Sequence, residues 1–281
     1  MKLSFTKMHG CGNNYLYFNC FEQTVSDPEA LSIRLSEPHF GIGSDGIILI
    51  SPSDKADAQM RIFNADGSEG RMCGNGIRCV GKYLYDNGMV GGRTTITVDT
   101  LSGVKTLTLS VKDGRMETAR VDMGAAILTP RDIPAALDGE RAIGVPLVVD
   151  ETVYHITCVS MGNPHCVVFL EEDIDQLDLP RIGPKFEHNA LFPERVNTEF
   201  VNILPDGSLK MRVWERGSGE TWACGTGACA VGVAACLTGR ARMNEDITVH
   251  LRGGDLTVQY TDETVFMTGA ATTVCKGEVE I

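Results

Sequence analysis

The chain has 281 residues, of which 43% are hydrophobic and 22% are charged, and this composition supports one large or two ordinary globular domains with a sizeable core. Its formal net charge is -12 and no run of Lys and Arg stands out, so a nucleic-acid backbone or an anionic membrane would repel it. The opening MKLSFTKMHG lacks the apolar region of an export signal, and no later stretch has the ~18 apolar residues of a membrane span. We therefore expect a cytoplasmic protein without nucleic-acid or membrane partners.

Short β-rich segments separated by turn residues recur along the chain. In chain order, strands are predicted at 15–18, 60–63, 94–98, 104–109, 118–123, 154–159, 166–169, 199–204, 209–214, 246–251, 256–260 and 264–269. One helical segment follows Cys73 and ends at Gly88, and another follows Cys224 and ends at Gly239. The second has no charge and carries small residues all round, which predicts a helix enclosed on every side by a curved sheet.

An internal repeat organises these segments. At an offset of 151 residues, 60–88 aligns with 211–239, and nine of the 29 positions are identical, whereas chance gives about two. A weaker match pairs Gly12-Asn13 with Gly162-Asn163, each before an apolar run. The sequence therefore predicts a mixed α/β protein of two pseudo-symmetric domains, each a curved, barrel-like mixed sheet around a central helix.

The ten cysteines are predicted to be reduced thiols, because the chain is long, lacks an export signal and surrounds most of them with apolar residues. Histidines at zinc spacing are missing near them, so we expect no metal site. Cys73 and Cys224 differ from the rest, because only they are matched by the repeat and both precede Gly-x-Gly at a helix start. Backbone N–H groups and the helix dipole there favour a thiolate with a lowered pKa, so both are candidate catalytic residues.

One apparent phosphate-binding motif is rejected. The run from Gly76 to Lys82 fits G-x-x-x-x-G-K, but Tyr83 follows instead of Ser or Thr, and the run falls inside the predicted helix. No G-x-G-x-x-G dinucleotide pattern, pyridoxal-phosphate motif or metal motif is evident, so we expect no cofactor.

Weaker candidates surround the two thiols. His165 lies between a Gly-Asn-Pro turn and an apolar strand, where a structural histidine is as common as a functional one. The pair Glu215-Arg216 interrupts a strand end just before Cys224, which favours a substrate role over a solvated ion pair. Asparagines at turns or strand starts are individually weak signals; they are Asn13, Asn64, Asn163 and Asn197.

Two thiols on duplicated domains fit one kind of chemistry. Equivalent side chains about a pseudo-twofold axis can hold a ligand carbon between them, so that one thiolate removes a proton and the opposite thiol returns one to the other face. The helix N-termini would stabilise the charge that builds on an adjacent carboxylate. This predicts reversal of a stereocentre by two cysteines without an organic cofactor.

Several sequence blocks resemble the diaminopimelate epimerase family: FTKMHGCGNNY, FNADGSEGRMCGNGIRC, MGNPH, RVNTEFV and WERGSGETWACGTGACA. The resemblance implies an isomerase that interconverts LL- and meso-2,6-diaminopimelate in lysine and peptidoglycan precursor synthesis, acting as a homodimer. It also implies a first domain of residues 1–120 completed by 270–281, and a second domain of residues 121–269. The only partner besides a second copy would be this small-molecule substrate.

The same resemblance assigns roles to individual residues. Cys73 and Cys224 would be the paired bases, with His165 and Glu215 assisting proton transfer. The substrate-binding residues would be Asn13, Asn64, Gly74, Asn75, Asn163, Asn197, Glu215, Arg216, Gly225 and Thr226. One departure is Gly46, which stands where many members carry a glutamine, so that side-chain contact is missing.

Two other functions remain open on sequence grounds. One is a different cofactor-independent amino-acid racemase of the same architecture, for instance one acting on histidine. Glu215, Arg216 and the four asparagines argue instead for a substrate with a second amino-acid end. The other is a non-catalytic thiol or zinc-binding protein, which would carry metal and exchange no substrate proton.

Overall fold

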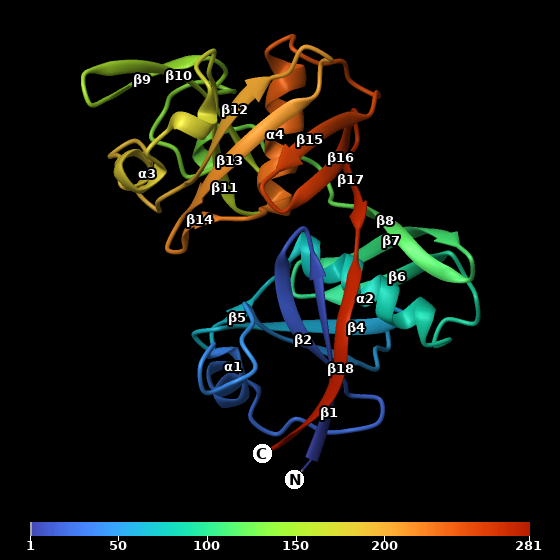
Figure 1. The fold of residues 1–281 in the computed structure, drawn as a ribbon. Helices are drawn as coiled ribbons and strands as arrows, with labels where there is room; N and C mark the ends of the chain where they lie inside the picture. The colour runs from blue at the N-terminus through green and yellow to red at the C-terminus, as the bar shows by residue number, and fades with distance from the viewer. Residues whose placement is uncertain (1) are drawn as a thin grey trace. The chain divides into compact units, whose positions relative to one another are not determined.

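The computed structural model describes residues 2–281, which divide into two compact units (Figure 1). One unit comprises Met1–Asp122 and Thr268–Ile281, and the other comprises Met123–Met267. The domain limits expected from the sequence, at 120 and 270, lie two residues from the limits of the first unit, at 122 and 268. Each unit is considered by itself below.

The first unit is a mixed sheet with two helices. Its strands are β1 (Lys2–Gly10), β2 (Asn13–Asn19), β3 (Gly46–Ser51), β4 (Ala58–Asn64), β5 (Glu69–Gly70), β6 (Thr95–Thr100), β7 (Gly103–Lys112), β8 (Arg115–Asp122) and β18 (Thr272–Glu280). Its helices are α1 (Pro28–Ser36) and α2 (Gly74–Asp86).

The sheet of this unit curves around α2. Pairing runs β18–β1–β2–β3–β4–β6–β7–β8, and it is antiparallel except for the parallel pairs β2–β3 and β4–β6. Helix α2 contacts β1 and β2, which lie toward one end of this strand order, and also β7 and β8 at the other end. A single helix that touches both ends of one sheet confirms the predicted curved, barrel-like sheet around a central helix.

The second unit repeats this plan. Its strands are β9 (Val145–Val149), β10 (Thr152–Ser160), β11 (Pro164–Phe169), β12 (Asn197–Ile203), β13 (Leu209–Glu215), β14 (Gly219–Thr221), β15 (Ile247–Leu251) and β16 (Gly254–Tyr260). The strand β17 (Val265–Ala270) begins in this unit, and its last three residues belong to the first unit. The helices of the second unit are α3 (Leu179–Glu187) and α4 (Gly225–Leu237), with short 3-10 turns at Pro130–Asp132 and Ile174–Gln176.

Matching elements follow one another in the same order in both units. The series β1, β2, α1, β3, β4, β5, α2, β6, β7 corresponds to β10, β11, α3, β12, β13, β14, α4, β15, β16. The parallel pairs correspond as well, because β11 pairs with β12 and β13 pairs with β15, as β2 does with β3 and β4 with β6. The predicted internal duplication is therefore confirmed at the level of topology.

The two central helices begin and end as the sequence predicts. Cys73 and Cys224 are the N-cap residues, and Gly88 and Gly239 follow the last turn with φ values of +72° and +73°, which glycine adopts without strain. Residues 227–235 of α4 are all buried, so this helix is enclosed on every side. Gly232 lets the sheet approach closely, since a Cβ there would lie 2.6 Å from Val258 Cγ1.

The C-terminal strand joins the first unit. β18 pairs antiparallel with β1 from Lys2↔Glu280 to His9↔Thr272, and both chain ends lie together in Figure 1. Within residues 2–281, no helix is both long enough and apolar enough to cross a bilayer.

Candidate active site

In the first unit, the Cys73 thiol lies at the first turn of α2. Its sulfur accepts the backbone N–H of Gly76 at 3.3 Å and lies 3.4 Å from Asn13 Oδ1. Asn75 Nδ2 donates to the same Asn13 oxygen at 3.4 Å. Burial raises the pKa of Tyr15 well above its ordinary value, and the nearby charges of Cys73 and Asp45 raise it further. The predicted residues Asn13, Cys73 and Asn75 thus share one hydrogen-bonded cluster.

Two charged side chains that the sequence did not single out hold this cluster in place. Asp45 Oδ2 accepts the side-chain amide of Asn13 at 2.8 Å. Arg78, fully buried in α2, donates to Asn75 Oδ1 at 3.0 Å and to the Gly74 carbonyl at 3.1 Å. The side chains around the thiol are therefore fixed before any ligand arrives.

Gly46, the departure from the family pattern, has no room for a side chain. Its φ is +151°, and a Cβ there would lie 2.1 Å from the Phe63 carbonyl oxygen and 3.0 Å from Asn64 Cα. This glycine lets β3 start close against the end of β4, where it pairs with Asn64. Asn64 itself donates to Ser68 Oγ at 3.0 Å and is half-buried.

In the second unit, Cys224 occupies the matching place at the start of α4. Its sulfur accepts the Gly227 N–H at 3.3 Å and lies 3.4 Å from Thr226 Oγ1. The thiol is buried, and burial raises its pKa well above the ordinary value, with the charges of Glu215 and Glu199 raising it further. The expectation of a lowered thiol pKa is therefore wrong for Cys224, because desolvation and two nearby carboxylates outweigh the helix N-terminus.

His165 is buried between two partners. Its Nδ1 lies 2.7 Å from Glu199 Oε1, and its Nε2 lies 3.1 Å from Asn163 Oδ1. Asn163 Nδ2 donates to Thr226 Oγ1 at 3.3 Å, which links the imidazole to the first turn of α4. The structure thus brings His165, Asn163 and Thr226 together with Cys224 and adds Glu199.

Three further predicted residues lie where β12 begins and β13 ends: Asn197 starts β12, Glu215 ends β13, and Arg216 follows it. Burial raises the pKa of Glu215, whose carboxylate accepts Thr221 Oγ1 at 2.5 Å and contacts the Cys224 thiol. Asn197 is buried and binds backbone on both sides, donating to the Pro164 carbonyl at 2.9 Å and accepting the Arg216 N–H at 3.0 Å. The Arg216 side chain is exposed, and its Nη1 donates to the Glu194 carbonyl at 3.1 Å.

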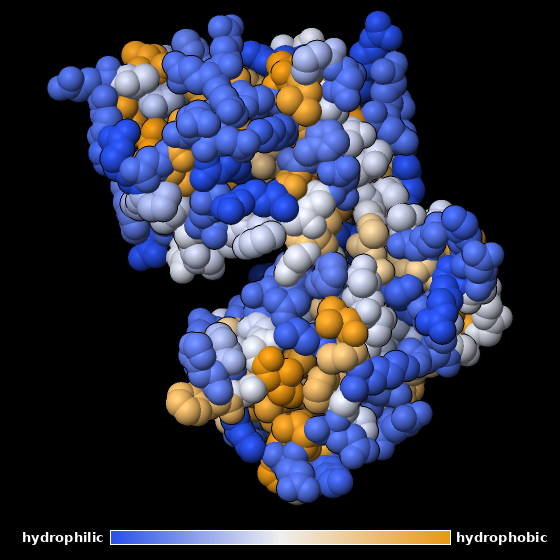
Figure 2. Space-filling model, viewed as in Figure 1, coloured by the Kyte–Doolittle hydropathy of each residue, from blue (hydrophilic) through white to orange (hydrophobic). Residues whose placement is uncertain are grey.

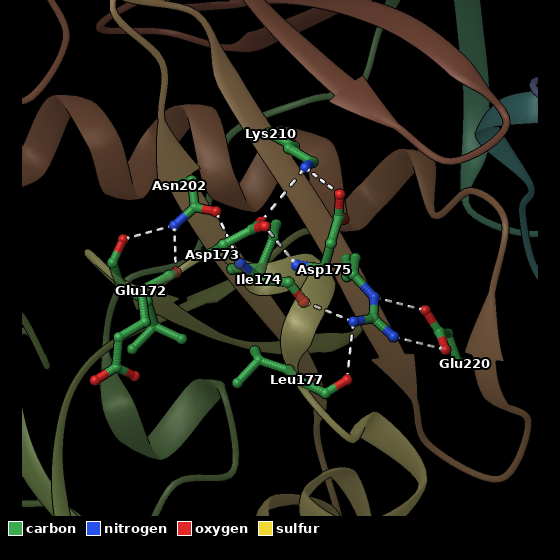
Figure 3. A network of polar contacts seen from close by, with 10 residues as sticks. Glu172, Asp173, Ile174, Asp175, Leu177, Asn202, Lys210 and Glu220 are labelled. Carbon is green, nitrogen blue, oxygen red and sulfur yellow. Dashed lines mark hydrogen bonds and ion pairs between the residues drawn. The ribbon is translucent and has the colours of Figure 1, made fainter.

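A matched ion pair braces the hairpin before each thiol. In the first unit, Arg61 donates to both oxygens of Glu69 at 2.7 and 3.0 Å, and in the second, Arg212 donates to both oxygens of Glu220 at 2.9 and 3.1 Å. Arg212 also donates to the carbonyls of Ile174 and Leu177, so the second pair sits in a wider network around Lys210 and Asn202 (Figure 3).

This difference in setting predicts unequal costs for the same substitution. Arg212→Lys loses the two parallel bonds in a setting where the side chains are only 11% and 15% exposed, and should cost ~1–3 kcal/mol of unfolding free energy. Arg61→Lys, where exposure is 40% and 28%, should cost ~0–1 kcal/mol. Urea unfolding of the two variants beside the parent measures both values. Equal losses would mean that burial does not strengthen the second pair.

The ten cysteines are free thiols, and six of them are buried. Burial raises the pKa of Cys79 to about 11 and that of Cys158 to about 12, as is typical of inert core cysteines. Among residues 2–281, one cluster of potential metal ligands is found: His165, Glu199 and Cys224.

Four residues at the site were missed by the sequence analysis: Tyr15, Asp45, Arg78 and Glu199. For Glu199 a signal exists, because it is a single charged residue in a strand whose first five residues are all buried. Tyr15 takes the place of His165 in the weaker repeat match, at an offset of 150 residues. No local signal marks Asp45, which acts on Asn13 from a separate loop.

Comparison with solved structures defines the class of fold. A hydroxyproline epimerase from Agrobacterium vitis superposes with a TM-score of 0.72 at 16% identity, covering 99% of this chain and 91% of its own. A phenazine biosynthesis protein of the PhzF family from Bacillus anthracis gives a TM-score of 0.70 at 16% identity over 100% of both chains. The chain therefore has the duplicated α/β fold found in amino-acid epimerases and racemases.

Sequence comparison narrows this to one family. The diaminopimelate epimerase family model matches residues 5–129 and 157–274. Diaminopimelate epimerase from Agathobacter rectalis is 55% identical over 99% of this chain and 100% of its own, and that from Acetivibrio thermocellus is 52% identical over 99% of each. The chain belongs to the diaminopimelate epimerase family and is an isomerase.

Proposed function

We propose that this protein interconverts LL- and meso-2,6-diaminopimelate with Cys73 and Cys224 as a thiolate and thiol pair. The observation that carries the proposal is the duplicated half-site, in which each thiol caps a helix and accepts the N–H of the third helical residue at 3.3 Å. The family and the relatives named diaminopimelate epimerase supply the substrate class.

The proposed chemistry needs only side chains and backbone. One cysteine, as thiolate, takes the α-proton while the other, as thiol, donates a proton to the opposite face of the same carbon. The carbanion's charge spreads into the adjacent carboxylate, which the first N–H groups of α2 and α4 at Gly74, Asn75, Gly225 and Thr226 would hold. His165 and Glu215 would assist proton transfer at Cys224. The Glu215 carboxylate contacts the Cys224 thiol, and the imidazole of His165 is buried in the same unit.

The rest of the substrate would be bound by the neighbouring polar groups. Asn13, Asn64, Asn163 and Asn197 would place its amino groups, and Glu215 and Arg216 would bind its distal amino-acid end. The exposed guanidinium of Arg216 supports this role, because its side chain has a single backbone partner in the described residues. The two units, with limits near 120 and 270, would be the two domains that enclose the substrate.

A direct assay tests the proposal. Incubation with LL-diaminopimelate in heavy water should give meso-diaminopimelate that carries one deuterium at the inverted carbon. The reaction should continue until the two isomers reach equilibrium. Chiral chromatography with mass spectrometry measures both quantities. Inversion without deuterium, or no turnover of either isomer, would refute the two-base scheme for this substrate. The same assay with histidine tests the alternative function, since a histidine racemase would invert histidine in preference to diaminopimelate.

Oxidation tests whether the two thiols act on one carbon. Thiols that close on opposite faces of a single atom can approach one another when the substrate is absent, so mild oxidation should link Cys73 to Cys224 and abolish activity. A thiol reductant should restore it. Peptide mapping of the inactive protein identifies the bond; if both thiols stay free while activity is lost, the opposed arrangement is wrong.

We further propose a cytoplasmic homodimer that supplies lysine and peptidoglycan precursor synthesis. Apolar side chains gather on the face of the first unit over β18, where Val274 is 55% exposed (Figure 2). Such a surface favours association with a second copy. Light scattering of the purified protein should give twice the 30.4 kDa chain mass, and a Val274→Lys variant should shift it toward the monomer.

A further inference from the structure

One buried carboxylate of the second unit takes no part in the proposed chemistry. Glu187, the last residue of α3, is only 4% exposed. Its Oε2 accepts the indole N–H of Trp214 at 2.7 Å, and its Oε1 accepts the backbone N–H of Gly217 at 2.9 Å. Trp214 and Gly217 stand on either side of Glu215 and Arg216 in the chain. One carboxylate therefore holds the chain before and after the two charged residues that we propose for the distal end of the substrate.

Helix α3 also fixes the indole ring of Trp214. The helix packs against β13 and β14 (Figure 1). At Gly183 the ring lies so close that a Cβ would come within 2.3 Å of Trp214 Cδ2. Any side chain larger than hydrogen at this position would force the ring to move, because a packed interior has no spare room. The ring face and the ring N–H of Trp214 are thus both set by α3.

The backbone between these two contacts is held as well. The Arg216 N–H donates to Asn197 Oδ1 at 3.0 Å, and the Ser218 N–H donates to the Glu215 carbonyl at 3.1 Å. Gly217 has a φ of +78°, which glycine adopts without strain, and its N–H is the one bound by α3. Each of these three N–H groups therefore has an acceptor. The backbone from which the two charged side chains extend is fixed before a ligand binds.

The number of acceptors explains why a carboxylate stands at the end of α3. Two N–H groups face the Glu187 side chain, and a carboxylate accepts at both oxygens, whereas a side-chain amide accepts at only one. The Arg195 guanidinium lies 3.6 Å from Oε1 and offsets the buried charge. A glutamine in this place would leave one of the two N–H groups facing its own NH2 group.

The matching place in the first unit is built differently. At the repeat offset of 151 residues, Trp214 corresponds to Phe63, and residues 215–216 correspond to the uncharged pair 64–65. Phe63 has no ring N–H, and its carbonyl instead accepts Ser32 Oγ from α1 at 2.9 Å. The buried carboxylate thus occurs in the unit whose hairpin carries the charged pair.

We infer that Glu187 is a positioning residue that sets the selectivity for the distal amino-acid end of the substrate, by fixing Glu215 and Arg216 from α3. The inference rests on the proposed function, which assigns that end of the substrate to this charged pair. Glu187 acts through the indole of Trp214 and the backbone of Gly217. Its loss should therefore weaken binding of the distal end more than proton transfer at the reacting carbon.

Hydrogen exchange in the free protein tests the contact without any substrate. Glu187→Gln preserves the side-chain shape but provides a single acceptor, so the indole N–H of Trp214 or the N–H of Gly217 loses its partner. At least one of these two hydrogens should exchange about 10-fold faster or more, as expected for loss of a hydrogen bond to a charged group. NMR of isotopically labelled protein follows both hydrogens.

Steady-state kinetics test the selectivity. Glu187→Gln should raise KM for diaminopimelate about 10-fold and change kcat less than about threefold, because the loss concerns binding of the distal end. In Arg216→Lys the distal contact is already weakened, so adding Glu187→Gln should cost less than about threefold in kcat/KM. A general loss of structure would instead multiply the two losses.

Asp57→Asn is the matched control. Asp57, in the first unit, likewise accepts a backbone N–H, that of Thr97 at 2.8 Å, and pairs with Arg93. Its replacement should change neither KM nor the exchange of the two hydrogens in the second unit.

Trp214→Phe provides a second variant should Glu187→Gln fold poorly, because it copies Phe63 and removes one of the two donors. One acceptor then suffices for Gly217, so adding Glu187→Gln to Trp214→Phe should leave KM unchanged. A further rise in KM would contradict the acceptor argument.

The inference is overturned if both hydrogens exchange at the parent rate in Glu187→Gln, if KM of this variant equals that of the parent, or if its loss multiplies with that of Arg216→Lys. If the parent does not epimerise diaminopimelate but exchange rises in Glu187→Gln, the proposed function fails, while the fixing of this loop by Glu187 stands.

Discussion

Replacing either Cys73 or Cys224 with alanine should abolish epimerisation of both LL- and meso-diaminopimelate. In the proposed mechanism each variant lacks the group that removes or returns the proton on one face of the substrate carbon, and the remaining thiol would serve only the other face. We expect kcat/KM to fall by more than about 1,000-fold, since a positioned acid or base contributes up to ~10,000-fold. Initial rates from each pure isomer measure the loss.

Other cysteines provide the controls for this result. Cys79→Ala changes a buried thiol in the same helix as Cys73, and Cys275→Ala changes an exposed thiol on β18. Both should keep activity within a few-fold of the parent, although Cys79→Ala should lower stability because it leaves space in the core. Near-normal turnover by Cys73→Ala or Cys224→Ala would show that the enzyme does not use two cysteine bases.

Arg216→Lys should lower kcat/KM for diaminopimelate by roughly 30-fold or more. A guanidinium grips a carboxylate through two parallel hydrogen bonds that an ammonium cannot reproduce, and loss of such a contact costs ~2–5 kcal/mol. The position suits this role, because Asn197 fixes the Arg216 backbone while the side chain is exposed. Alkylation of both thiols should be unchanged, since in the proposed complex Arg216 would contact the distal end of the substrate and not the thiols.

The matched measurement compares substrates. Lysine lacks the second carboxylate, so the parent should have a far lower kcat/KM for lysine than for diaminopimelate. The ratio of these two kcat/KM values should be smaller in Arg216→Lys. Arg181→Lys, an exposed arginine of the same unit that binds Asp150 at 3.2 Å, should change neither value. Equal use of lysine and diaminopimelate by the parent would move the assignment toward a different amino-acid racemase.

The fold was predictable where the information is local or repeated. Nine identities between 60–88 and 211–239 indicated the duplication, and Cys-Gly-x-Gly with a later glycine marked both ends of α2 and α4. Helices α1 and α3 were missed because each is short. Their starts nevertheless carry a signal, since Asp27 caps α1 by accepting the Ala30 N–H at 3.0 Å and Pro28 follows it.

The sequence by itself determined the two thiols, their helix positions and the family resemblance, because each depends on a pattern of neighbouring residues that recurs in the chain. Tertiary structure alone decided what surrounds them. Glu199 reaches His165 across 34 residues, and Arg78 holds Asn75 while contacting the distant Ala270 carbonyl. The raised pKa of Cys224 likewise depends on burial and on carboxylates from two other strands, quantities that exist only once the sheet has closed around α4.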